Sequence, residues 1–242
     1  MRASTYPILI LTILLAVTCS GLDKNVGCGA EPLYSRYGLH GGELKSPDGK
    51  SLLTVRKLRD SKDPDGYVSY RVEVGGKHFS ARLSGWGTEV LWSPDSRAFA
   101  ANQTEGGGGI GHRTYVFYLT DNGLRKVDVS APVEKVFGSP VKCEAPVSPN
   151  TATLKWLDSK RILVVAEVVP VSICECGGTF QTYELSLPYM EILQVYTQAE
   201  TRRFFGGALG CELRRADDRC ARSWQTAPQT GISQAYPARD LH

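Results

Sequence analysis

The sequence predicts an all-β protein made of three blade-like, four-stranded antiparallel sheets, followed by a short helical segment near the C-terminus. Two observations carry this prediction: a tight-turn motif that occurs three times, and two further strand-like runs behind each copy. The motif is clearest in the Ser-Pro-Asp-Gly sequence at 46–49. Proline presets φ for a type I turn, and the glycine accepts the left-handed position of a bulged hairpin.

The second copy of the turn is Ser-Pro-Asp-Ser at 93–96, and the third is Leu-Asp-Ser-Lys at 157–160. Ser96 stands where the first copy has glycine, so a left-handed serine is expected there at some cost in strain. Apolar runs follow the three turns at 52–55, 98–101 and 162–166. Short apolar runs bounded by turn residues are typical of strands that are buried on both faces.

Each unit then continues with a second pair of strand-like runs, at 67–74 and 78–83, at 114–119 and 124–129, and at 180–187 and 190–196. Four short strands per unit is the composition of a propeller blade. The extra length of the third unit falls in 106–112 and 133–149, which are expected to be loops. Closed propellers typically have about four or more blades. Three units therefore leave three alternatives: residues 22–44 supply a fourth sheet, the array is open, or two chains complete a ring.

The pattern W-S-P-D-G-K followed by apolar residues resembles the WD40-like repeats of TolB-type bacterial propellers, over roughly residues 40–196. Lys45 stands where that family has an aromatic residue, and Leu157-Asp158 replaces its Ser-Pro. The resemblance implies a module that binds proteins or peptides, or an accessory domain. It implies no site residues, because the motif is structural.

Residues 1–19 are predicted to be a signal peptide, because the apolar run at 8–16 is too short to span a bilayer, which needs ~20 residues. The Ala-Val-Thr-Cys sequence at 16–19 resembles a bacterial lipoprotein box, with Cys19 as the lipidated residue. Ordinary secretion and a retained anchor are the alternatives. The expected location is the bacterial cell envelope, periplasmic or membrane-anchored, with a secreted protein as the alternative. Residues 20–39 are expected to be a linker or an extra strand.

Seven cysteines in an exported chain favour disulfides, and Cys19 is expected to lie outside them. A local pair of Cys211 with Cys220 and a bridge from Cys143 to Cys174 or Cys176 are the candidates. Zinc would need four ligands at recognisable spacing, and no histidine lies near Cys174. No metal site and no cofactor are therefore expected.

The formal charge of +3 is too small to indicate nucleic-acid binding. The arginines between 202 and 222 form either a solvated helical face or a contact for an acidic partner or anionic lipid. None of the common catalytic motifs occurs, so no catalytic residue is assigned. The glycine-rich stretch 105–112 contains G-x-G-x-x-G, but a strand follows it where a dinucleotide site needs a helix. It is expected to be a flexible loop with an exposed His112 at its edge.

The chain from 197 to 224 is predicted to be helical and that from 225 to 242 to be a disordered tail. The aromatic residues expected to pack between blades are Trp86, Trp92, Trp156, Tyr115 and Phe117. Repeats without a catalytic constellation favour an exported envelope module that binds or scaffolds a protein partner through a propeller-like surface. A hydrolase whose Ser/His/Asp site is assembled by folding, and a purely structural envelope lipoprotein, are the alternatives.

Overall fold

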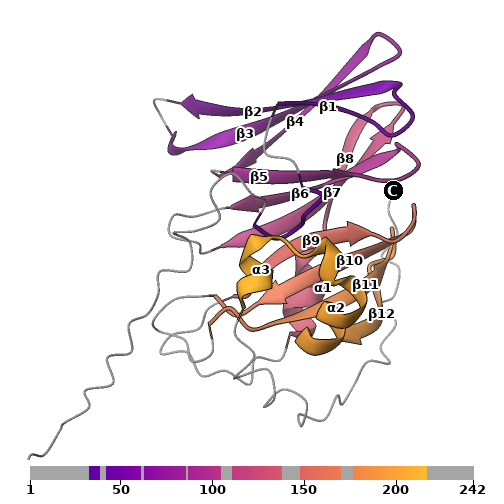
Figure 1. The fold of residues 1–242 in the computed structure, drawn as a ribbon. Coiled ribbons are helices and arrows are strands. Elements are labelled where there is room, and N and C mark those ends of the chain that lie inside the picture. Colours follow the sequence, from indigo (N-terminus) through magenta and orange to yellow (C-terminus); the bar gives the residue numbers. More distant parts are fainter. Residues whose placement is uncertain are drawn as a thin grey trace, which may run out of the picture.

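The computed structural model of the protein describes residues 33–38, 42–60, 63–85, 87–104, 111–137, 148–169 and 177–216. Within these ranges the strands form three four-stranded antiparallel sheets stacked one above another (Figure 1). The predicted fold class is therefore confirmed. The predicted signal peptide with Cys19 and the predicted tail at 225–242 lie outside the described residues. No helix in the described ranges is long and apolar enough to cross a membrane.

In each sheet, which we call a blade, every strand pairs with the next one along the chain. Blade 1 contains β1 (Gly42–Lys45), β2 (Ser51–Asp60), β3 (Asp63–Val74) and β4 (Lys77–Ser84). Blade 2 contains β5 (Gly87–Trp92), β6 (Ala98–Thr104), β7 (His112–Thr120) and β8 (Gly123–Asp128). Blade 3 contains β9 (Asn150–Trp156), β10 (Arg161–Glu167), β11 (Phe180–Ser186) and β12 (Glu191–Tyr196).

The first two turn motifs share one set of hydrogen bonds. The Ser46 hydroxyl donates to the Asp48 carboxylate at 2.6 Å, and that of Ser93 donates to Asp95 at 2.7 Å. Each serine oxygen also accepts the first backbone N–H of the following strand. Side chains that bond the backbone ahead of them are what closes such turns. The same four-residue motif therefore produces the same local structure in both blades.

The fourth residue of the motif adopts the expected left-handed conformation in both blades, with φ of 72° at Gly49 and 63° at Ser96. Serine in this region is strained by its Cβ, as the sequence predicted. The third copy lacks the first serine. There the Asp158 carboxylate accepts the Lys160 N–H at 2.8 Å, and the Leu157 N–H donates to the carbonyl of Arg161.

A repeated tryptophan contact links each blade to the one before it. The indole N–H of Trp92 in β5 donates to the carbonyl of Leu44 in β1, and that of Trp156 in β9 donates to the carbonyl of Leu91 in β5. Lys45 occupies the corresponding position in blade 1 and is exposed. Blade 1 thus begins the stack, because its first strand has no earlier blade to contact in the described chain.

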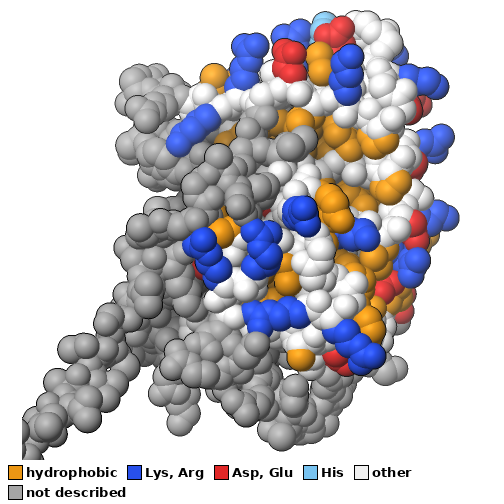
Figure 2. Space-filling model, in the orientation of Figure 1, with side chains coloured by type: hydrophobic (Ala, Val, Ile, Leu, Met, Phe, Trp, Pro, Cys, Tyr) orange, Lys and Arg blue, Asp and Glu red, His pale blue; other side chains and the backbone are white. Residues whose placement is uncertain are grey.

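The two ends of the stack are finished in different ways. The strand register places Glu43, Lys45, Arg56, Arg71, Glu73 and Arg82 on the outward face of blade 1, where all six are exposed. Charged side chains accordingly crowd that end of the molecule (Figure 2). Terminal repeats of stacked proteins usually carry such a polar outer face.

The outer face of blade 3 is covered by α2 (Gln198–Phe205), the 3₁₀ turn η2 (Gly206–Ala208) and α3 (Cys211–Arg215) (Figure 1). Thr197 and Glu200 form a reciprocal capping box that starts α2. Within one chain, the described residues form an open stack, and a ring completed by a second chain stays a prediction. Residues 42–45 belong to blade 1 and form no part of a fourth sheet.

One helix lies where the sequence predicted only a loop. Helix α1 (Ser130–Val136) follows blade 2 and precedes blade 3 in the chain, so residues 133–136, which were expected to belong to a loop, are helical. The Asp128 carboxylate accepts the first two helical N–H groups, those of Ser130 and Ala131. Pro132 is tolerated because it lies in the first turn, where no intrahelical donor is lost. A helix this short has too few residues for its apolar period to stand out.

Candidate binding cleft at the hairpin rim

The tight turns of blades 1 and 2 lie at the same end of the stack and enclose a cleft of about 510 Å³. We call this feature the rim cleft. Four hairpins contribute to it, through residues 48–51, 74–79, 95–97 and 119–121. The first and third of these turns touch directly, because the Asp48 N–H donates to the Ser96 Oγ at 3.0 Å. That bond holds the two Ser-Pro-Asp turns side by side across the blade boundary.

Three apolar side chains contribute to the lining of the rim cleft. Val74, Phe79 and Leu119 are half-buried there, and Ser96, which also lines the cleft, is buried at 6% exposure. Pockets that bind ligands generally combine apolar side chains with a few polar groups at fixed positions.

Charged side chains border the cleft. The carboxylates are those of Asp48, Asp95 and Asp121, and the cations are Lys50, Lys77 and Arg97. The Ser46 hydroxyl and the Lys50 backbone N–H donate to Asp48 and hold the pKa of that carboxyl below its ordinary value. None of the three cations makes a side-chain hydrogen bond or a salt bridge with the described part of the chain.

A second polar region is buried beneath residues 33–38, which we call the strap. The Glu89 carboxylate, 4% exposed, accepts the backbone N–H groups of Leu33, Tyr34 at 3.0 Å and Ser35 at 3.2 Å. The Tyr34 hydroxyl donates to Glu167 at 3.2 Å. Burial raises the pKa of Tyr34 well above its ordinary value, and the charges of Glu167, Glu212 and Glu89 raise it further.

The strap also bonds to the C-terminal helical segment. Gly210 donates its N–H to the Tyr34 carbonyl at 2.7 Å, and Glu212 donates to the Leu33 carbonyl at 3.0 Å. A Cβ added at Gly210 would lie 2.4 Å from the Leu33 carbonyl oxygen, so only glycine fits. The strap therefore ties blade 2 and blade 3 to α3. The polar groups under the strap are buried. We therefore interpret this region as a structural contact that holds the fold together.

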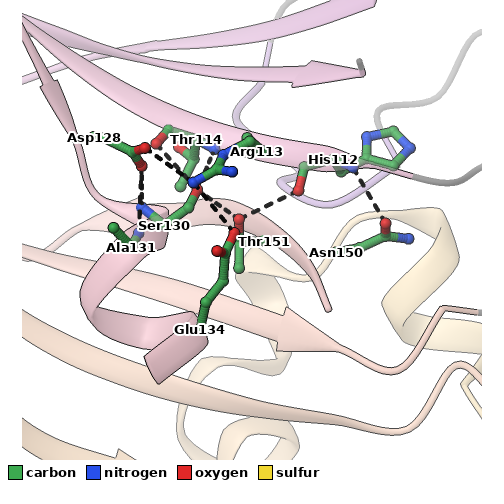
Figure 3. Close-up of polar contacts among 9 residues, drawn as sticks. All are labelled: His112, Arg113, Thr114, Asp128, Ser130, Ala131, Glu134, Asn150 and Thr151. Carbon is green, nitrogen blue, oxygen red and sulfur yellow. Dashed lines mark hydrogen bonds and ion pairs between the residues drawn. The ribbon is translucent and has the colours of Figure 1, made fainter. Parts of the chain in front are cut away.

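The junction between blades 2 and 3 carries a third polar network (Figure 3). The Thr151 hydroxyl donates to the Ser130 Oγ at 2.6 Å, and Asn150 Oδ1 accepts the His112 N–H at 3.2 Å. Arg113 lies 3.0 Å from the Asp128 carboxylate and 3.5 Å from that of Glu134. These contacts fix α1 against β7 and β9.

The two histidines among the described residues do not form a serine–histidine pair. The His112 ring points away from Ser130 (Figure 3), and its Nδ1 lies 3.1 Å from the Thr104 hydroxyl. His78 Nδ1 lies 3.5 Å from the Glu73 carboxylate. Within the described ranges, no three His, Cys, Asp or Glu side chains are grouped so as to hold a metal ion.

The expectation that His112 is exposed is wrong, because only 6% of the residue is accessible. The ring of Tyr34, which the strap brings from a distant part of the chain, covers it.

The predicted aromatic residues Trp92, Trp156, Tyr115 and Phe117 do pack between blades, whereas Trp86 lies outside the described residues. Two of the predicted basic residues contact helix ends, Arg202 at the Ala216 carbonyl and Arg214 at that of Leu209, which fits a solvated helical face.

Of the candidate disulfide residues, only Cys211 is described. It is 2% exposed and disulfide-bonded. The other candidates, Cys143, Cys174, Cys176 and Cys220, lie outside the described residues. The pairing of Cys211 with Cys220 stays a prediction.

The rim cleft was missed by the sequence reasoning, although one signal was present. A cation follows both turns at the same position, Lys50 after the first and Arg97 after the second. The repeat places these two cations at one end of neighbouring blades. Lys77 and Asp121 carry no comparable signal, since they join the cleft only through the stacking of the blades.

No protein-family model and no curated protein matches the chain. Among solved structures, the protein is similar to Pyrococcus horikoshii acylaminoacyl peptidase in an orthorhombic crystal form. The sequence identity is 10% and the TM-score is 0.35, over 68% of this chain and 26% of that chain. The chain thus spans about a quarter of the length of that protein.

Proposed function

We propose that this chain is an exported envelope module of WD40-like, TolB-type repeats that binds a protein partner at the rim cleft. The observation that supports it is the cleft itself, a hollow lined by both apolar and charged side chains from the turns of two blades. The repeated turn bonds and tryptophan contacts support the repeat type. The signal-peptide-like residues 1–19, with a lipid on Cys19 as one form of anchoring, support the envelope location.

Site-specific photo-crosslinking tests the proposal. A photoreactive amino acid at Asp121, on the border of the cleft, is expected to capture one discrete partner. The matched control is Gln194 on β12, another exposed position, which belongs to blade 3 and lies outside the cleft. The captured protein, once purified, should bind the unmodified chain and lose affinity for the Lys77→Glu variant.

Equal capture at Asp121 and Gln194, or undiminished binding by Lys77→Glu, would contradict the proposal. A serine-directed activity probe on the same sample separates the two classes of function. Stoichiometric labelling that disappears on substitution of one serine would identify a hydrolase instead.

A further inference from the structure

We infer that the rim cleft recognises a carboxylate that stands next to an apolar side chain, as at the C-terminus of a protein partner. This inference rests on the proposed function, and it names the chemistry that the partner presents.

The cations of the cleft are available to a ligand, whereas two of its three carboxylates are already engaged. Asp48 and Asp95 each have one oxygen that accepts a serine hydroxyl and a backbone N–H within its own turn. Lys50, Lys77 and Arg97 make no side-chain hydrogen bond or salt bridge in the described chain and are exposed. A ligand carboxylate can therefore bond to them without displacing an internal partner.

Ser96 lies between the two turns that form the cleft. Its oxygen accepts the Asp48 N–H at 3.0 Å, and its hydroxyl interacts with the Asp48 carboxylate and helps to lower the pKa of that group. The residue is buried and lines the cleft. Ser96 thus helps to hold Asp48 in place and leaves the cations as the donors for a ligand carboxylate.

The apolar side chains of the lining specify what accompanies the carboxylate. Val74, Phe79 and Leu119 are each only half-buried, and covering them with an apolar side chain would remove further area from water. Asp121 also lines the cleft and repels a singly charged group less than it repels a phosphate dianion, which favours a carboxylate as the group that the cations bind. A terminal carboxylate on an apolar residue meets both conditions, and so does an acidic side chain beside one.

Fluorescence anisotropy with three labelled peptide pools tests this inference. Each pool has five randomised residues before a final leucine. The first pool ends in a free carboxylate, the second in an amide, and the third in an amide with glutamate before the leucine. We expect the first pool to bind about tenfold more tightly than the second. Binding by the third pool would assign the carboxylate to a side chain, and its absence would assign it to the chain terminus.

Two charge-reversal variants provide a second test of the inference. Lys77→Glu and Arg97→Glu should each weaken binding of the first pool by about tenfold, and Lys77→Gln should weaken it less, in the same direction. Arg56→Glu is the matched control, because this exposed cation lies on the outward face of blade 1. It should leave the affinity unchanged.

Binding of the amidated second pool as tight as that of the first, or no binding by any pool, overturns the inference. An equal loss in the Arg56→Glu variant overturns it as well, since the effect would then come from overall charge. If Asp121 still captures a partner while the pools show no dependence on a carboxylate, the inference fails and the proposed function stands.

Discussion

The imidazole of His112 lies edge-on against the phenol ring of Tyr34, with ring centres 4.9 Å apart and planes at 62°. The first residue lies at the start of β7 and the second in the strap, so the contact joins blade 2 to the chain that closes the stack. Burial lowers the pKa of His112 to about 4. The histidine is therefore neutral in the folded protein at neutral pH.

Acid should destabilise the protein through His112. Its folded-state pKa of about 4 lies below the ordinary value of 6.5, so the unfolded state binds more protons between these values. The free energy of unfolding should be highest above about pH 6.5 and fall by about 3 kcal/mol as the pH approaches 4. Urea unfolding at a series of pH values measures this slope. His112→Asn should flatten it and His78→Asn, at an exposed position, should not; an unchanged slope in His112→Asn would refute the assignment.

Loss of the Glu89 carboxylate should loosen the strap. Glu89→Gln keeps the shape of the side chain but replaces one acceptor oxygen with a donor, opposite strap N–H groups that also donate. We expect a loss of about 2 kcal/mol in the free energy of unfolding. Hydrogen exchange should accelerate at the amides of residues 33–35. The control Glu43→Gln, exposed on blade 1, should change stability by less than about 0.5 kcal/mol. Unaltered exchange at the strap would count against this account.

Two substitutions at Ser96 separate backbone strain from hydrogen bonding. Ser96→Ala loses the bond from the Asp48 N–H and keeps the left-handed conformation, so it should cost about 1 kcal/mol. Ser96→Gly loses the same bond but relieves the strain, by about 1 kcal/mol, and should be close to neutral. Gly49→Ala should cost a similar amount through φ alone, because an added Cβ meets no atom within 4 Å. Equal midpoints in urea for both Ser96 variants would show that strain plays no part.

The mature protein should contain at least two intramolecular disulfides, with Cys19 outside them. Closing the loop of ~10 residues between Cys211 and Cys220 would stabilise the fold by roughly 2–3 kcal/mol. Intact mass after alkylation, with and without reduction, counts the bonds. Cys211→Ser should lower the count by one. Complete alkylation without a reductant would rule the bonds out and would call for a zinc assay around Cys174 and Cys176.

The sequence was sufficient to predict the three hairpin turns and the strands around them. The turns are closed by hydrogen bonds between residues close in sequence, such as Ser46 and Asp48. The four-residue motif is therefore sufficient to predict the turn. It also predicted a strained serine at position 96, since only one residue of the motif had changed. The sequence did not predict helix α1. The helix is held by hydrogen bonds between Ser130 and residues of β7 and β9, which are distant in the chain, and by the Asp128 carboxylate, which lies two residues before the helix.

The amino-acid pattern thus determines the three repeated units and the strands within them, because these depend on local turn chemistry and strand alternation. Only the tertiary structure decides how the described blades stack, with a polar outer face on blade 1 and helices over blade 3. It alone brings Asp48 to Ser96, brings Tyr34 to His112, and places Lys77 and Arg97 in the lining of one cleft. These residues are far apart in the chain, and no local preference encodes their proximity. Their positions follow from the stacking of whole sheets, which the burial of apolar faces between blades drives.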